Sequence, residues 1–123
     1  MTIKECYLRL DGDYDDIMER LGTEKLVERF MLKFPQEGEK QMAALHEAME
    51  NEDIEECFKV AHTLKGVSAN LSITGLYQKA SALTEQLRPL TNAPDPKLVI
   101  ALKEEYDHVL TVLQDYVDEK EEV

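Results

Sequence analysis

Apolar residues recur at intervals of three and four along most of this chain, which is the pattern of helices with one buried face. No segment shows the strict alternation of apolar and polar residues that is typical of half-buried strands. Four longer apolar stripes separated by short breaks predict an all-α protein. We expect an antiparallel up-down four-helix bundle with a short extra N-terminal helix. The longer stripes lie in residues 24–50, 53–71, 73–88 and 96–117, after a shorter stripe in residues 13–21.

Local signals place some of the helix ends. Pro35 removes a backbone donor from the first long stripe, so this stretch is either one kinked helix or two stacked helices. Asp53 precedes Glu56 by three residues, which resembles a capping box, and the next helix is expected to begin there. Ser72 or Thr74 is expected to cap the helix that follows.

The chain has 123 residues, which is enough for one domain with a single core. We therefore predict one domain over residues 1–123. Residues 1–12 are predicted to form a short helix or an N-terminal cap on the bundle, although their apolar residues are too dense for a clear period. The mostly charged residues 118–123 are expected to fray. A finished bundle leaves no apolar stripe exposed, so we expect a monomer.

The formal net charge of −12 argues against a nucleic-acid-binding protein and against adsorption to anionic membranes, because both need a basic surface. No apolar run approaches the roughly 20 residues that span a bilayer. The N-terminus lacks the apolar core of a signal peptide, because Lys4, Glu5 and Arg9 interrupt it. We therefore expect a cytoplasmic protein. The two cysteines, Cys6 and Cys57, show no C-x-x-C spacing and predict no zinc site.

Residues 57–71 predict an amphipathic helix with one histidine on its polar side. His62 lies about 160° from the middle of the apolar sector, so its imidazole is expected to face solvent. Lys59, Lys65 and Gly66 lie three or four residues from His62 and therefore share its side of the helix.

Gly66 needs a reason, because a glycine inside a helix costs about 1 kcal/mol relative to alanine. Here it leaves a bare patch beside the imidazole, where a bulky group or a partner backbone can come close. Lys65 supplies a cation that can pair with an anion on the ring. These residues indicate that His62 carries a phosphoryl group. The alternative is an ordinary surface histidine beside a tolerated glycine.

Residues 61–71, with the sequence AHTLKGVSANL, resemble the signature of histidine-containing phosphotransfer (HPt) domains of bacterial phosphorelays. The order of helices over residues 13–118 is similar to that family more loosely. The family usually has glycine after the final leucine, where this chain has Ser72.

The resemblance implies that His62 takes a phosphoryl group from a receiver-domain aspartyl-phosphate and passes it to another receiver aspartate. Lys65 would stabilise the phosphoryl group, and Gly66 would give it room. The expected partners are receiver domains of response regulators and a hybrid histidine kinase. The chain would be a carrier without kinase activity of its own. It would need no cofactor, since the Mg²⁺ belongs to the receiver.

Three further residues belong to the predicted site. Lys59 is added from helix geometry as a second cation that supports the phosphoryl group. Phe58 lies one turn before His62 and outside the apolar sector, so it either wraps inward or offers a partner an apolar contact. Ala69 is predicted to contact the partner.

Two other functions were weighed. Glu105 and His108 form an E-x-x-H pair, but a di-metal bundle needs two such pairs plus carboxylates from other helices, so no metal site is predicted. The second alternative is an interaction bundle or adaptor that has lost phosphotransfer. Intact His62, Lys65 and Gly66 argue against it, and Ser72 is the one mark in its favour.

Overall fold

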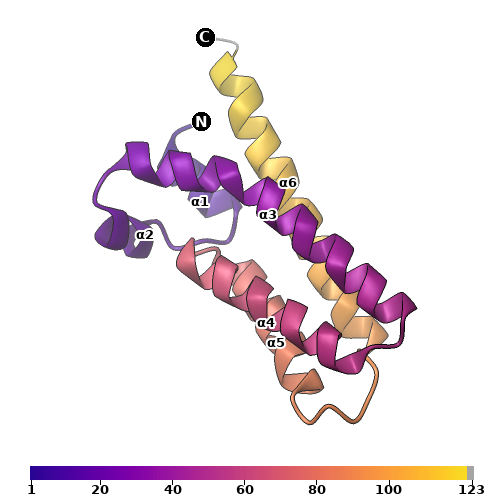
Figure 1. Ribbon diagram of the computed structural model, residues 1–123. Coiled ribbons are helices and arrows are strands. Elements are labelled where there is room, and N and C mark those ends of the chain that lie inside the picture. The colour runs from indigo at the N-terminus through magenta and orange to yellow at the C-terminus, as the bar shows by residue number, and fades with distance from the viewer. Residues whose placement is uncertain (122–123) are drawn as a thin grey trace.

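The computed structural model describes residues 1–121, and all regular secondary structure in this range is helical (Figure 1). The prediction of an all-α protein is therefore confirmed. The helices are α1 (Ile3–Arg9), α2 (Tyr14–Leu21), α3 (Glu24–Glu50), α4 (Ile54–Asn70), α5 (Thr74–Leu87) and α6 (Pro96–Glu121).

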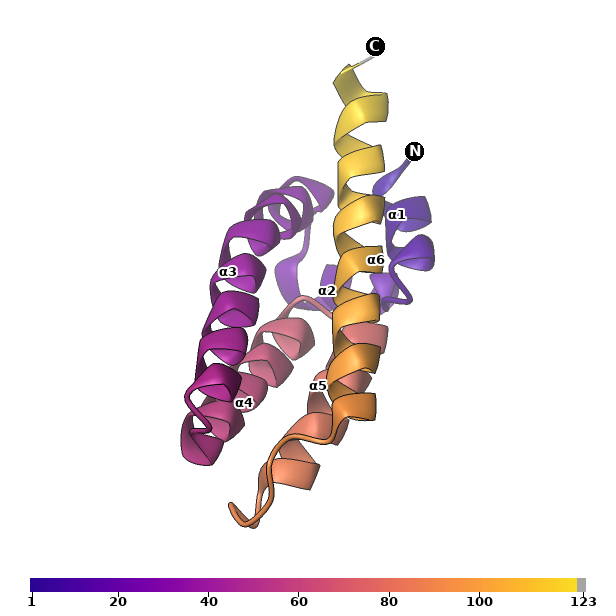
Figure 2. The ribbon, with the colours of Figure 1, turned by 90° about the vertical axis from the view of Figure 1, so that its right-hand side faces the viewer.

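The four longer helices pack against one another in chain order. α4 lies between α3 and α5, and α6 packs on α5 and also contacts α3 (Figure 2). Residues 51–53 and 71–73 are all that connect α3 to α4 and α4 to α5, and such short connections are typical of neighbouring helices in a bundle. The antiparallel up-down order of all four helices stays a prediction.

The long stripe with Pro35 forms a single helix, α3, with the proline inside it. Of the two alternatives, one continuous helix is therefore the correct one. Three residues after the proline, Gly38 lets α6 come close: a Cβ atom there would lie only 2.6 Å from Cε1 of Tyr106. Pro35 has no backbone N–H to donate to the helix. The apolar contacts of α3 with its neighbours stabilise the helix around this position.

The N-terminal segment forms two short helices: α1 lies where a short helix or cap was predicted, and α2 lies within the shorter stripe of residues 13–21. Thr2 caps α1 by accepting from Glu5 N–H, and Asp13 caps α2 by accepting from Asp16 N–H.

α3 and α6 are the longer pair of helices, with 27 and 26 residues, against 17 and 14 in α4 and α5. The long helices thus extend past the α4–α5 turn, and α1 and α2 pack in this region (Figures 1 and 2).

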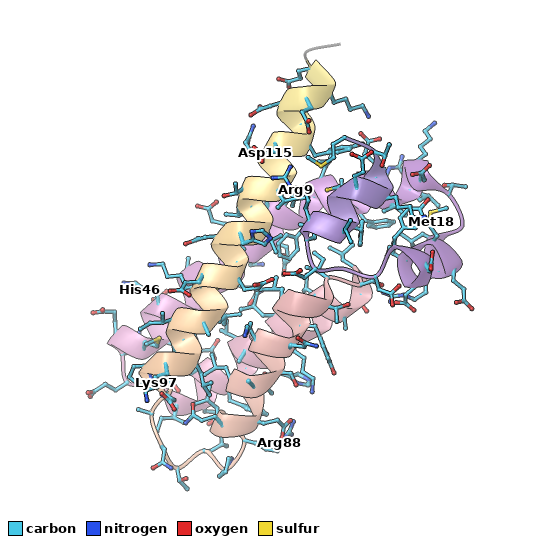
Figure 3. All side chains as sticks on the ribbon, turned by 180° about the vertical axis from the view of Figure 1, so that it is seen from behind. Arg9, Met18, His46, Arg88, Lys97 and Asp115 are labelled. Atoms are coloured by element: carbon cyan, nitrogen blue, oxygen red, sulfur yellow. The ribbon has the colours of Figure 1, made fainter. Side chains whose placement is uncertain are left out.

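α1 and α2 are part of the core. Cys6, Tyr7, Leu10 and Ile17 are all fully buried. On the outside, Arg9 of α1 forms an ion pair with Asp115 of α6 at 2.7 Å (Figure 3). Residues 1–12 therefore pack against the long helices, as a cap would.

Two predicted boundaries are wrong. The N-cap of α5 is Ile73, which makes no capping hydrogen bond, and neither Ser72 nor Thr74 caps this helix. Residues 118–121, the start of the tail that was expected to fray, continue α6 through Glu121. Lys120 pairs there with Glu28 of α3, and the terminal amine of Met1 lies 3.8 Å from Glu119. Residues 122–123, the rest of the predicted tail, lie outside the described residues.

No helix within residues 1–121 is both long enough and apolar enough to cross a membrane.

Candidate functional site

α4 carries the predicted histidine on its outer face. Asp53 caps the helix by accepting a hydrogen bond from Glu56 N–H at 3.1 Å, as its sequence predicts. The helix buries one side, where Ser68 satisfies its hydroxyl by donating to the Leu64 carbonyl at 2.7 Å. His62 lies on the opposite side and is exposed. The buried residues of α4 are Cys57, Val60, Ala61, Leu64 and Ser68.

The ring of Phe58 lies against the imidazole of His62. The two rings are stacked, with centroids 6.1 Å apart and planes inclined by 18°. Phe58 is half-buried and packs against the core. The predicted inward packing therefore holds for one part of the side chain, and the other part stays exposed. The guanidinium carbon of Arg88, at the end of α5, lies 5.5 Å from the centroid of the same ring. Phe58 thus contacts both the imidazole and a cation from the next helix.

Arg88 is fixed by a carboxylate of its own helix. It donates to Glu85 through Nε at 3.1 Å and through Nη2 at 2.8 Å. This two-pronged hydrogen bond holds the pKa of the Glu85 carboxyl below its ordinary value, and the charge of nearby Lys65 lowers it further. Sequence reasoning missed Arg88 and Glu85. An acid–base pair three residues apart was visible, but its place beside Phe58 depends on how α4 and α5 pack.

The two lysines of the predicted site have different neighbours. Lys65 is half-buried, with its Nζ 6.0 Å from the ring centroid of Tyr77 on α5, and it forms no ion pair within residues 1–121. Lys59 forms an ion pair with Glu55, one turn before it, at 3.6 Å. Lys65 is therefore the lysine whose charge is not already paired.

Gly66 faces open space. A Cβ atom at this position would meet no atom within 4 Å. Packing inside the described chain therefore does not demand a glycine here, and the bare patch predicted beside His62 is present. Ala69 is also exposed, and its carbonyl accepts a hydrogen bond from Arg20 of α2 at 2.6 Å.

A groove of about 430 Å³ opens where α2, α3 and α4 meet. His62, Gly66 and Asn70 follow one another at four-residue intervals, and Asn70 lines the groove. Val67, five residues after His62, also lines the groove, so the histidine lies about 7.5 Å along α4 from it, at 1.5 Å per residue. Phe30, which is 42% exposed, supplies apolar surface to it. The lining residues are Arg20, Leu21, Phe30, Lys33, Phe34, Glu37, Val67, Asn70 and Leu71.

The E-x-x-H pair of α6 has other partners. A ring nitrogen of His108 lies 2.6 Å from the Arg9 carbonyl oxygen, to which it donates. Glu105 lies beside Asp11 and Gly75, and burial together with the charge of Asp11 raises the pKa of its carboxyl. Within residues 1–121, no three potential metal ligands of the His, Cys, Asp and Glu types come together. The di-metal hypothesis gains no support.

Comparison with known families decides the relationship of the chain. Residues 29–112 match the family described as Hpt domain, over more than half of the sequence. The chain belongs to the Hpt domain family. Membership implies histidine phosphotransfer in phosphorelays, with receiver domains and histidine kinases as partners. Comparisons with curated proteins and with solved structures gave no match.

Proposed function

We propose that this protein accepts a phosphoryl group on His62 from a receiver-domain aspartyl-phosphate and passes it to the aspartate of another receiver. The observation that carries the proposal is the exposed imidazole beside the open position of Gly66, on a helix inside the matched region. An ordinary surface histidine would not require the less stable glycine one turn away.

The transfer needs one nucleophile from this chain. The unprotonated ring nitrogen of neutral His62 attacks the phosphorus atom, a nitrogen–phosphorus bond forms, and the bond from phosphorus to the aspartyl oxygen breaks. The receiver aspartate leaves as a carboxylate, and the second ring nitrogen keeps its proton. The reverse sequence delivers the group to the next receiver. We propose that the chain has no kinase activity of its own and that the receiver supplies the Mg²⁺.

One cation that is unpaired within residues 1–121 supports the phosphorylated state. Phosphoryl transfer depends mainly on positioning and on neutralisation of charge. The unpaired charge of Lys65 lies on the same side of α4 as His62, whereas Arg88, across the Phe58 ring, is already paired with Glu85. In a chain of net charge −12, this local positive charge favours an anionic group on the imidazole.

The receiver is proposed to dock over the outer face of α4 and the groove beside it. A specific interface buries about 800 Å² on each partner, so contacts must extend beyond the imidazole. The exposed apolar surface of Phe30, the open patch at Gly66 and exposed Ala69 lie on this side. We propose that a monomer, with its four long helices in antiparallel up-down order, presents this surface.

The test is phosphoryl uptake from phosphorylated receiver domains. We expect acid-labile, base-stable phosphate on the wild type and none on His62→Gln, with the fold of the variant unchanged. His46→Gln is the matched control, because the His46 side chain is 78% exposed on α3. It should take up phosphate normally. A wild type that stays folded but accepts nothing from several receivers would support the adaptor function instead.

A further inference from the structure

The turn between α4 and α5 is held by the N-terminal segment of the chain. The hydroxyl of Tyr7 donates to the Leu71 carbonyl at 2.8 Å. The backbone N–H of Asp13 donates to the Ser72 carbonyl, also at 2.8 Å. Both contacts join residues that are about sixty positions apart in the sequence. Hydrogen bonds to the turn that ends the His62 helix therefore anchor α1 and the residue that precedes α2.

Ser72 has an unusual backbone within this turn. Its φ is 54°, in the left-handed region that a residue with a Cβ atom adopts at a cost. The turn is closed by its own backbone, because Ile73 N–H donates to the Ser68 carbonyl at 3.0 Å and Ser72 N–H to the Ala69 carbonyl at 3.1 Å. Neither bond needs a side chain at position 72, and glycine would suit the backbone better.

The Ser72 side chain is used by α2. Ser72 is only 5% exposed, and its hydroxyl donates to Asp16 Oδ2 at 2.6 Å. Nη2 of Arg20 donates both to this hydroxyl and to the Ala69 carbonyl, each at 2.6 Å. Asp16 and Arg20 are one turn apart on α2 and form an ion pair at 3.4 Å. The three side chains thus join the last two turns of α2 to the end of α4.

This connection bears on the groove beside the site. Arg20 and Leu21, at the end of α2, line it opposite Val67 and Asn70 of α4. Ser72 and Asp16 do not line it. Anything they do to binding in the groove must therefore act through the Arg20 side chain that they hold and the position of α2.

We propose that Ser72, Asp16 and Arg20 form a clamp that fixes α2 against the end of α4 and so keeps the groove in the shape that a receiver domain binds. The proposal rests on the proposed function, because it takes the groove as part of the receiver-docking surface. Ser72 and Asp16 are positioning residues in this account, and the chemistry at His62 does not depend on them.

The test is phosphoryl transfer from a phosphorylated receiver at a series of receiver concentrations. Ser72→Gly keeps the left-handed backbone and removes the hydroxyl. Asp16→Asn keeps the size of the side chain and removes its charge. We expect each variant to raise the receiver concentration at half-maximal rate about three- to tenfold, as loss of the net contribution of one ordinary hydrogen bond would. The maximal rate should stay within about twofold, since the bound geometry at His62 is unchanged.

Leu90→Gly is the matched control. Leu90 also has a positive φ, of 59°, but it lies in the exposed loop after α5, away from the groove. This variant should leave both kinetic parameters unchanged. A second readout is the hydrogen exchange of the α2 amides, which should become faster in Ser72→Gly and stay at the wild-type rate in Leu90→Gly.

The clamp proposal would be overturned if Ser72→Gly and Asp16→Asn left the receiver concentration at half-maximal rate unchanged. It would also be overturned if they lowered only the maximal rate. If the wild type accepts no phosphoryl group, the proposed function fails separately. The exchange of the α2 amides then still decides whether the clamp exists, and equal exchange in wild type and Ser72→Gly would refute it.

Discussion

The outer face of α4 and the turn that ends this helix differ in nearly every physical respect. On the outer face, His62 is exposed and Gly66 is surrounded by open space. At the turn, Leu71, Ser72 and Ile73 are buried. Tyr7 of α1 bonds to the Leu71 carbonyl, Asp13 to the Ser72 carbonyl, and two side chains of α2 to the Ser72 hydroxyl. A site that must receive a phosphoryl group and a partner gains from open space. The turn fixes the end of the same helix, and contacts with the surrounding segments favour this role.

The largest effect on stability is expected from Tyr7→Ala, at the turn. Tyr7 is fully buried and donates to the Leu71 carbonyl, so its truncation should lower the free energy of unfolding by about 3–5 kcal/mol. Urea denaturation measures this value. Tyr7→Phe should lose only about 1 kcal/mol. Leu8→Ala, at a neighbour that is 78% exposed, should stay within about 0.5 kcal/mol of wild type. Equal losses at Tyr7 and Leu8 would contradict the contrast.

The largest effect on transfer is expected from Gly66→Glu, on the outer face. The new side chain enters open space, so the variant should unfold at least as late in urea as the wild type. Its bulk and negative charge beside His62 should slow phosphoryl transfer about a hundredfold or more, as misplaced reacting groups do. Gly66→Ala is the control and should be more stable by about 0.5–1 kcal/mol. A normal transfer rate in Gly66→Glu would remove the steric argument.

A smaller effect on transfer is expected from the cations near His62. Lys65→Gln should slow transfer about two- to fivefold, because a partly exposed charge contributes little through water. Lys59→Gln and Arg88→Gln are the comparisons, since Lys59 is already paired with Glu55 and Arg88 with Glu85, and each should change the rate less. Rates measured with one phosphorylated receiver test the order. A larger effect at Lys59 than at Lys65 would contradict the assignment.

The smallest effect concerns Glu105 of α6, which lies beside Asp11 of the N-terminal segment and makes the stability of the protein depend on pH. Burial followed by the charge of Asp11 raises the pKa of the Glu105 carboxyl, while His108 and Lys79 act in the opposite direction. A raised pKa in the folded state means that the stability from protonated Glu105 is fully present below the unfolded pKa and is lost as the pH rises through the folded value. Glu105→Gln should therefore gain stability over the wild type at pH 7 and lose that gain at pH 4. A constant difference between the two proteins would contradict this account.

The sequence predicted the part of the site that lies within one helix. The distances between His62, Lys65 and Gly66 on α4 follow from helical geometry alone, so their shared side needed no tertiary structure. The stripes likewise predicted the longer helices, because each helix buries one apolar face. The sequence also predicted a bare patch at Gly66, and the structure has open space there.

What depends on packing between distant segments could not be predicted. Ser72 was one of two residues expected to cap α5, but its hydroxyl bonds to Asp16, which is 56 positions earlier. Arg88 reaches the Phe58 ring only because α5 lies beside α4. The charged end of α6 looked unstructured, yet Lys120 pairs with Glu28 on α3. In each case a polar side chain found a partner that no local pattern shows.

The most direct test of the central claim is a complete relay with two receiver domains. One receiver is phosphorylated on its aspartate, the second is not, and the carrier is added in a small catalytic amount. The account predicts that the phosphoryl group appears on the second receiver only when wild-type protein is present, with phosphohistidine at position 62 as the intermediate. Transfer at the same rate with His62→Gln, or no transfer with folded wild type across several receiver pairs, would contradict it.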